Sequence, residues 1–287
     1  MKITEYISAV RENVERARQQ GKTIVLIPTM GFLHYGHLSM VEAARQGDEE
    51  HEKVYIVMSI FVNPLQFGPK EDYDRYPRNL ARDTRLAQEA GVDLLFVPSV
   101  EEMYPEGASL TTVNVAKVSE GLCGAHRPGH FQGVATVVTK LFNIVRPDVA
   151  YFGQKDYQQF VVIKQMVEDL NIPIKLALMP TVREADGLAM SSRNSYLSPE
   201  QRRQAPVLFK SLQSAVELIE SGERDPEVVR KNIEQRIRNE SDGQIEYIEI
   251  RNAENLEKID IINGKVVIAL AVRLGSTRLI DNVIVEV

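Results

Sequence analysis

Two patterns of hydrophobic residues alternate along most of the chain. Short apolar segments typical of buried strands lie at 23–28, 54–62, 93–98, 149–153 and 174–182. Segments with apolar residues every three or four positions, typical of amphipathic helices, lie at 3–17, 38–45, 77–91, 133–145 and 157–171. Buried strands that alternate with helices predict a parallel sheet with helices on both faces, which is an α/β fold.

The pattern changes after Val182. Residues 198–201 read Ser-Pro-Glu-Gln, which predicts a capping box with proline at the first helical position, and Asp225 precedes Pro226 in the same way. Three segments typical of strands follow, at 244–250, 265–274 and 278–287. Helices followed by consecutive strands predict a smaller α+β domain with an antiparallel sheet. We therefore expect a first domain over 1–182 and a second over 183–287.

Composition narrows the class of protein. The chain has 287 residues, 44% of them hydrophobic and 26% charged, with 17 glycines and 13 prolines. These values exclude a disordered, collagen-like or coiled-coil chain. The net charge of -6 argues against general nucleic-acid binding, because a phosphate backbone requires a basic surface.

The expected location is the cytoplasm. Cys123 is the single cysteine, which excludes an internal disulfide and suits a reducing compartment. The most apolar stretch, 54–62, is far shorter than the roughly 20 residues that span a bilayer. Residues 1–21 mix acidic and basic side chains without a continuous apolar core, so we expect no signal peptide. We also expect no membrane partner.

Three of the predicted strand-to-helix loops contain unusual polar residues: 30–37, 63–67 and 153–159. In open α/β sheets, ligands bind beyond the carboxyl ends of the strands, where such loops lie. The predicted architecture and the unusual residues therefore indicate the same edge of the sheet.

His34 and His37 lie three residues apart at a strand-to-helix turn, so both imidazoles face one side of the first helical turn. The free N–H groups of a helix N-terminus form an anion site, and imidazole donors there can stabilise a phosphate. The alternative is a pair of exposed loop histidines. Four of the five histidines lie in two glycine-containing loops, which favours a function.

Zinc binding is a competing hypothesis for the second histidine loop. Cys123, His126 and His130 have the spacing of a metal half-site, although the segment is rich in Gly and Pro and has no acidic neighbour. Residues 124–130 also imitate a phosphate-binding P-loop, but His130 replaces the essential lysine, so that match fails.

Two further loops suit a nucleotide. Lys155 could neutralise phosphates and Asp156 could accept hydrogen bonds from ribose, although Asp156 could equally cap a helix. Residues 190–194 read Met-Ser-Ser-Arg-Asn, which suits a mobile clamp over phosphates or a solvated linker between domains.

The motifs together resemble the pantoate–β-alanine ligase family. They are TMGFLHYGH at 29–37, FVNPLQF at 61–67, RPGHFQGVATVV at 127–138, YFGQKDYQQF at 151–160 and GLAMSSRNSYLS at 187–198. The similarity covers essentially the whole chain in the same order. The H-x-G-H element alone would indicate only the broader nucleotidyl-transferase group, which includes class I aminoacyl-tRNA synthetases.

The resemblance implies a fold, a reaction and partners. It implies a Rossmann-like first domain, a smaller C-terminal domain that acts as a lid, and a homodimer. The implied reaction joins pantoate to β-alanine in two steps: ATP, with Mg²⁺, first converts pantoate to pantoyl adenylate, and the amine of β-alanine then displaces AMP. The implied partners are therefore small-molecule substrates.

The resemblance also implies residue roles by motif position. His37 is the expected proton donor, with His34 and Lys155 on the phosphates, and Gln66 and Gln159 are the expected pantoate clamp. Gln66 would also border β-alanine. The remaining expected ATP contacts are Met30, Gly31, Phe32, Leu33, Tyr35, Gly36, Gly153, Gln154, Asp156, Val182, Met190, Ser191, Ser192 and Arg193. Asn63 and His130 are expected to line the site.

Two other functions remain open from sequence alone. One is a different H-x-G-H nucleotidyl transferase, such as an enzyme that makes a dinucleotide or a charged tRNA. The other is a catalytically silent module that binds a nucleotide.

Overall fold

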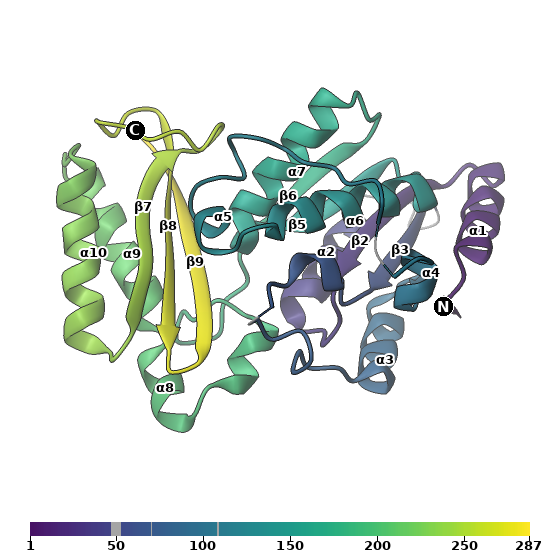
Figure 1. Cartoon of the computed structure of the whole chain (residues 1–287), viewed down its shortest axis with the longest axis horizontal. Coiled ribbons are helices and arrows are strands. Elements are labelled where there is room, and N and C mark those ends of the chain that lie inside the picture. The colour runs from purple at the N-terminus through teal and green to yellow at the C-terminus, as the bar shows by residue number, and fades with distance from the viewer. Residues whose placement is uncertain (47–52, 70, 108) are drawn as a thin grey trace. The chain divides into compact units, whose positions relative to one another are not determined.

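The computed structural model describes residues 1–46, 53–69, 71–107 and 109–287 (Figure 1). It divides into two compact units, each described here by itself. The first unit contains Met1–Val115, Arg127–Gly153 and Val162–Met179, and the second contains Ala116–His126, Gln154–Val161 and Pro180–Val287. The second unit thus includes two short segments from the first half of the chain.

The first unit is built on a six-stranded sheet in which every pair of neighbouring strands is parallel. Its strands, in spatial order, are β1 (Lys2–Thr4), β4 (Leu94–Phe96), β3 (Val54–Ile60), β2 (Thr23–Thr29), β5 (Val149–Gly153) and β6 (Lys175–Met179). Sequence order reverses between β2 and β5, which makes their carboxyl ends the switch point where such sheets bind ligands. The predicted parallel α/β fold is confirmed.

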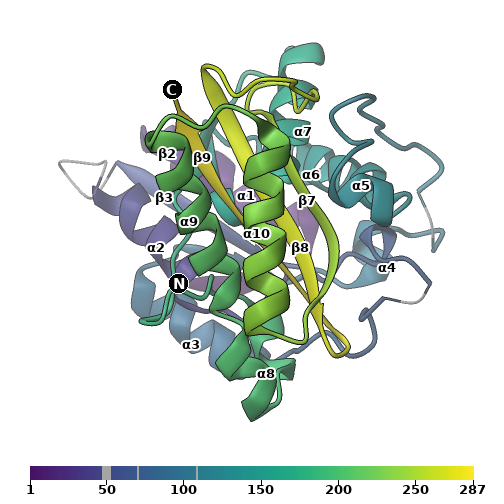
Figure 2. The same ribbon diagram turned by 90° about the vertical axis from the view of Figure 1, so that its left-hand side faces the viewer.

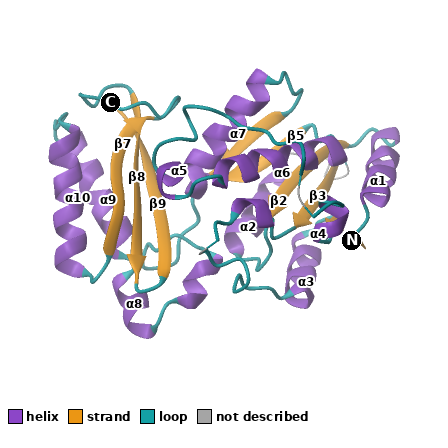
Figure 3. Cartoon of the chain, in the orientation of Figure 1, coloured by secondary structure: helices purple, strands orange, loops and turns teal. Residues whose placement is uncertain are grey.

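Helices cover both faces of this sheet (Figure 3). The helices of this unit are α1 (Ile7–Gln19), α2 (Tyr35–Gln46), α3 (Leu80–Ala90), α4 (Val100–Met103), α6 (His130–Val145) and, from Val162 onwards, α7 (Tyr157–Asp169). Apolar residues of β2 and β3 such as Val25 and Met58 pack with Val41 of α2 and Ala87 of α3. On the other side α1 and α6 pack against β2 and against each other. Most residues of α6 are buried, so this helix belongs to the core of the unit.

The sequence prediction was wrong at the first helix. Ile3 belongs to β1 and pairs with Leu95 of β4, and the helix begins only at Ile7. The spacing from Ile3 to Ile7 matches a helical period, but the edge of the sheet provides the backbone partners that decide the conformation. Sequence periodicity contains no information about that edge.

The second unit contains a three-stranded antiparallel sheet of β7 (Gln244–Asn252), β8 (Lys265–Leu274) and β9 (Thr277–Glu286). Its helices are α5 (Cys123–His126), α8 (Pro199–Gln204), α9 (Val207–Glu220) and α10 (Pro226–Glu240). Figure 2 shows α9 and α10 side by side across one face of the sheet, where apolar residues of both helices and all three strands form one core. The predicted α+β architecture is confirmed.

Both predicted helix starts are confirmed. Ser198 Oγ accepts from the Gln201 N–H at 3.2 Å, and Gln201 Oε1 accepts from the Ser198 N–H at 3.0 Å, which completes the capping box. Asp225 caps α10 through the Glu227 N–H at 2.8 Å. None of the described helices combines the length and apolar character needed to cross a membrane.

Candidate functional site

The turn after β2 has an unusual backbone. Gly31 and Phe32 both have positive φ, at +83° and +50°. A Cβ atom on Gly31 would lie 2.8 Å from Ile60 Cγ2, so this position requires glycine. Thr29 Oγ1 accepts from the Gly31 N–H at 3.1 Å and donates to the Ser59 carbonyl at 2.8 Å, which ties the turn to β3.

Asp83 of α3 stabilises this turn from the side. Its carboxylate accepts from the Phe32 N–H at 2.7 Å and from the Leu33 N–H at 2.8 Å, and the residue is only 1% exposed. Arg82 donates to the Leu33 carbonyl at 2.7 Å. The sequence analysis did not identify Asp83. The signal was present, because Asp83 occupies the buried stripe of α3 together with Ala87.

The two histidines lie where the turn enters α2. The His34 N–H donates to Nδ1 of His37 at 3.2 Å, and the two ring centroids are 4.0 Å apart. Because Nδ1 of His37 is an acceptor, the neutral ring carries its proton on Nε2. The turn therefore presents an imidazole donor beside the N-terminus of a helix, an arrangement suited to a phosphate.

A second group of predicted residues lies around the short helix η1 (Pro64–Gln66). Asn63 donates from Nδ2 to Gln66 Oε1 at 3.2 Å and to the Gly133 carbonyl at 3.1 Å. Tyr104 donates to Asn63 Oδ1 at 2.9 Å, and burial raises the pKa of this phenol, which keeps it a donor. Gln66 Nε2 lies 2.9 Å from Met30 Sδ, which links η1 to the turn after β2.

His130 supports η1 from the start of α6. A guanidinium cannot accept a hydrogen bond, so the Arg127 contact of 3.0 Å makes His130 Nε2 the acceptor. Nδ1 therefore carries the proton and donates to the Gln66 carbonyl at 2.8 Å. Arg127 also pairs with Glu71 at 2.6 Å. Burial alone would raise the pKa of Glu71, but the Arg127 hydrogen bonds and charge bring it below its ordinary value.

The other predicted residues belong to the second unit, apart from Gly153, which ends β5 in the first. Gln154, Lys155 and Asp156 form the short helix η2, and Gln159 lies in the first turn of α7. The side chains of Lys155, Asp156 and Gln159 make no hydrogen bond or ion pair with any residue that the structure describes, which leaves them available to a ligand.

The segment from Val182 to Arg193 forms a tight hairpin followed by the short helix η3 (Ser192–Tyr196). The Val182 carbonyl accepts from the Met190 N–H at 2.9 Å. Ser191 caps η3 by accepting from the Arg193 N–H at 3.3 Å, and Ser192 is buried. The predicted residues therefore fall into two sets, one in each unit.

The structure describes no group of three or more His, Cys, Asp or Glu side chains that could bind a metal ion within 1–46, 53–69, 71–107 and 109–287. Two of the three residues of the zinc hypothesis, His130 and Cys123, contact other protein groups. Both ring nitrogens of His130 contact other groups, and Cys123 Sγ lies 3.1 Å from Tyr247 Oη.

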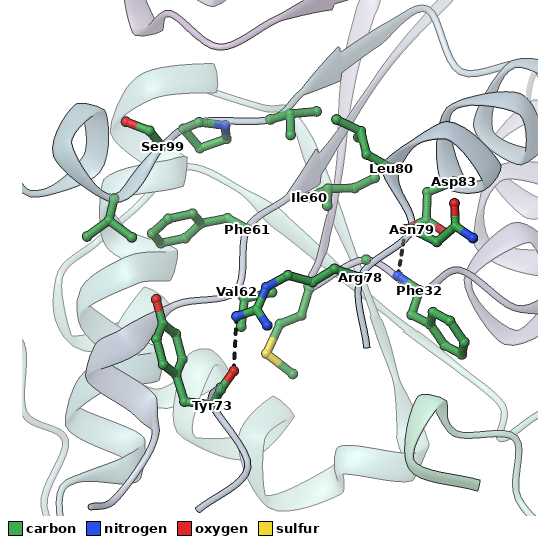
Figure 4. A pocket seen from close by; sticks show the side chains of 15 residues that line it. Phe32, Ile60, Phe61, Val62, Tyr73, Arg78, Asn79, Leu80, Asp83 and Ser99 are labelled. Carbon is green, nitrogen blue, oxygen red and sulfur yellow. Dashed lines mark hydrogen bonds between the residues drawn. The ribbon is translucent and has the colours of Figure 1, made fainter. Parts of the chain in front are cut away.

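A cavity of about 310 Å³ lies behind the turn after β2 (Figure 4). Its lining residues include Met30, Gly31, Phe32, Phe61 and Arg78. The Arg78 guanidinium donates to the Tyr73 carbonyl at 3.0 Å. Three predicted ATP contacts, Met30, Gly31 and Phe32, line this cavity, but neither histidine of the H-x-G-H element nor Gln66 does, so it overlaps the predicted site only in part.

A doubly wound sheet with a histidine pair at its switch point defines an α/β enzyme that binds an anionic ligand at the carboxyl edge of the strands. The family model for pantoate-beta-alanine ligase matches residues 2–284. The chain belongs to the pantoate–β-alanine ligase family. It is therefore a ligase of pantothenate synthesis.

Similar proteins cover the chain from end to end. The pantothenate synthetase of Desulfitobacterium hafniense is 59% identical over 286 residues, which cover 100% of this chain and 99% of the relative. That of Acetivibrio thermocellus is 58% identical, with 100% of both chains covered.

Solved structures agree with this result. The crystal structure of the Thermus thermophilus pantothenate synthetase is 46% identical, with a TM-score of 0.91 and 99% of each chain covered. A Francisella tularensis pantoate-beta-alanine ligase, complexed with beta-gamma ATP and beta-alanine, is 33% identical, with a TM-score of 0.80, 99% of this chain and 97% of that chain covered. The fold of the whole chain is thus that of its family.

Proposed function

We propose that the enzyme joins pantoate to β-alanine through a pantoyl adenylate. A carboxylate oxygen of pantoate attacks the α-phosphorus of ATP, and the bond to the β-phosphate breaks to release pyrophosphate. The β-alanine amine then attacks the acyl carbon, the bond to the AMP oxygen breaks, and the amine loses a proton. The family membership and the ATP- and β-alanine-bound Francisella relative support this scheme.

The observation that carries the proposal is the hydrogen bond from the His34 N–H to His37 Nδ1. It makes Nε2 the nitrogen of His37 that carries the proton, and we propose that this N–H donates to a phosphate at the helix N-terminus. A donor in this place stabilises the negative charge that grows on the phosphates as pyrophosphate departs. His34 is proposed to contact the same phosphates.

Gln66 and Gln159 are proposed to bind pantoate. Amide side chains can donate to the hydroxyl and carboxylate oxygens of a hydroxy acid without changing its protonation. The Gln66 side chain is fixed by Asn63 and Met30, so its orientation is set before the acid arrives. We propose that Asn63 and His130 act here by positioning Gln66, which also borders the β-alanine position.

Nucleotide contacts are proposed in each unit by itself, on the residues that the family motifs indicate. Lys155 supplies an ammonium for the phosphates, Asp156 accepts from ribose hydroxyls, and the backbone of Val182 faces adenine. Phosphates also suit the backbone N–H groups of the turn after β2 and the donors of the Met190–Arg193 segment. Mg²⁺ would enter with ATP as part of the substrate, because this ion binds mainly phosphate oxygens and water.

Three properties of the whole protein complete the proposal. The functional domains are proposed to be 1–182 and 183–287, with the second acting as a lid that excludes water from the easily hydrolysed adenylate. The protein is proposed to be a homodimer that acts in the cytoplasm, as its single cysteine suits. It is proposed to need no nucleic acid or membrane partner.

The test is exchange of labelled pyrophosphate into ATP with pantoate present and β-alanine absent. The first step needs no amine, so exchange should proceed. Exchange at limiting pantoate should fall in Gln159→Ala and recover at higher pantoate concentration. Exchange that is equally fast without pantoate would contradict the proposed substrate, and no exchange from an enzyme that still makes pantothenate would contradict the adenylate.

A further inference from the structure

Asn282 of β9 connects the C-terminal sheet to the proposed nucleotide loop within the second unit. Its side-chain Nδ2 donates to the Gln154 carbonyl at 2.9 Å and to the Lys155 carbonyl at 3.0 Å. The residue is 3% exposed, so both donors of one buried amide are used on two consecutive carbonyls of η2. These contacts fix the backbone from which the Lys155 ammonium extends.

The residue before it, Asp281, makes the equivalent connection to the hairpin. Its carboxylate pairs with Arg183 through two contacts of 2.6 Å and 3.0 Å, and its side chain is also buried. The same guanidinium donates to the Gly187 carbonyl at 3.1 Å and lies 3.6 Å from the centre of the Phe209 ring. The base of the hairpin that leads to Met190 is therefore attached to β9 and α9.

Neighbouring strand residues point to opposite faces of a sheet, which explains how two adjacent side chains reach two different segments. Asp281 shares its face with Leu279 and Val285, whose side chains join the core beneath α9 and α10. Asn282 points to the opposite face, where it contacts η2. The dipeptide Asp281-Asn282 thus contacts η2 directly and, through Arg183, the base of the hairpin that leads to Met190.

We propose that Asn282 is a positioning residue for the adenylation step, acting through Lys155, with Asp281 fixing the hairpin in the same frame. This inference rests on the proposed role of Lys155 in binding ATP phosphates. Without the amide, the η2 carbonyls lose their partner and the loop must be ordered when ATP binds. A phosphate contact displaced by about 1 Å can cost on the order of a hundredfold in rate.

The experiment is a double-mutant cycle with Asn282→Ala, Lys155→Ala and the double variant, measured by pantoate-dependent ATP–pyrophosphate exchange. We expect Asn282→Ala to lower the exchange turnover roughly tenfold or more and to raise the ATP Michaelis constant, with that for pantoate unchanged. The double variant should be no slower than Lys155→Ala, because Asn282 acts through Lys155. Asn255→Ala, which changes an exposed loop asparagine of the same unit, is the matched control and should behave as wild type.

The outcomes separate the two ideas. Three results would overturn the positioning role. The effects of the two substitutions could multiply in the double variant, or a folded Asn282→Ala could keep near-wild-type exchange. The Michaelis constants for ATP and pantoate could also change equally. Near-wild-type exchange by Lys155→Ala would instead overturn the proposed function of that lysine. Thermal unfolding verifies folding, and Asn282→Leu, which keeps the size of the side chain but has no donor and no charge, replaces the alanine variant in the cycle if that variant does not fold.

Discussion

The backbone of His34 determines which nitrogen of His37 carries the proton. A histidine in solution exchanges between two neutral tautomers, but here Nδ1 accepts from a fixed N–H at 3.2 Å and only Nε2 is left to donate. The motif spacing therefore does more than place two rings on one side of a helix. It sets the chemical form of one ring.

Replacements of His37 should distinguish its two nitrogens. An asparagine amide reaches the position of Nδ1, whereas a glutamine amide reaches that of Nε2. We expect His37→Asn to lose turnover by about a hundredfold, like His37→Ala, because the phosphate donor is absent. His37→Gln should keep more activity than either. Equal turnover in the asparagine and glutamine variants would show that the position of the donor is irrelevant.

The partners of several supporting residues could not be predicted, because they are distant in sequence. Asp83 contacts a backbone N–H 51 residues away, Arg127 pairs with Glu71 across 56 residues, and Asn282 reaches Gln154 across 128. The motif residues were found from their chemistry and spacing and from resemblance to a family, both of which identify ligand contacts. Asp83 and Asn282 lie outside those motifs, and Arg127 lies inside one, but in all three cases the folded chain was needed to show the partner.

At the scale of elements, η1 and α6 approach each other more closely than side chains would allow. A Cβ atom on Gly133 would lie 2.2 Å from the Leu65 carbonyl oxygen and 2.7 Å from the Gln66 nitrogen. A glycine inside a helix lowers stability compared with alanine. Gly133 is required here because the backbone of η1 packs against it and leaves no room for a side chain.

Gly133→Ala should therefore damage both stability and pantoate use. Overpacking at a buried contact costs about 1–3 kcal/mol, and relief of the clash must move η1 and with it Gln66. We expect a lower melting temperature than in wild type. We also expect the Michaelis constant for pantoate to rise more, relative to wild type, than that for ATP. Asn143→Ala, at an exposed position of the same helix, is the control. Unchanged pantoate kinetics in Gly133→Ala would disprove the coupling to Gln66.

Most elements were predictable because strong periodicity and cap residues mark them. The strand over 149–153, the cap at Ser198 and the cap at Asp225 were predicted as the structure has them. The sequence prediction was wrong where tertiary contacts determine the conformation. At Ile3 the backbone pairs with β4 and forms the edge strand of the sheet. Short helices such as η1 and η2 also gave no periodic signal, and these contain predicted ligand contacts.

At the scale of the molecule, each unit contains a partly buried carboxylate that is paired with arginine. Glu71 pairs with Arg127 in the first unit, and Glu246 pairs with Arg278 at 2.7 Å in the second. For Glu246 too, burial alone would raise the pKa, but Arg278 and Arg273 bring it below its ordinary value of 4.5. Both carboxylates therefore favour the folded state while they are charged.

This predicts acid sensitivity with a definite sign. A carboxylate whose pKa is lowered by folding contributes stability above its unfolded pKa, and that contribution disappears as the pH falls through the folded pKa. Thermal unfolding of wild type and of Glu71→Gln/Glu246→Gln should differ most near neutral pH. The difference should shrink between about pH 5 and about pH 3. A difference that stays constant with pH would contradict the charged pairing.

The polar groups of the Asn63 side chain have consequences for redesign of the enzyme. Its Nδ2 reaches Gln66 and the Gly133 carbonyl, and its Oδ1 accepts from Tyr104 and, at 3.3 Å, from the Leu65 N–H. A change in this small network leaves at least one buried polar group without its partner. A single substitution at Gln66 therefore carries the free-energy cost of an unpaired buried group, and we expect a library for altered acid specificity to give more folded variants when Asn63 and Tyr104 vary together with Gln66.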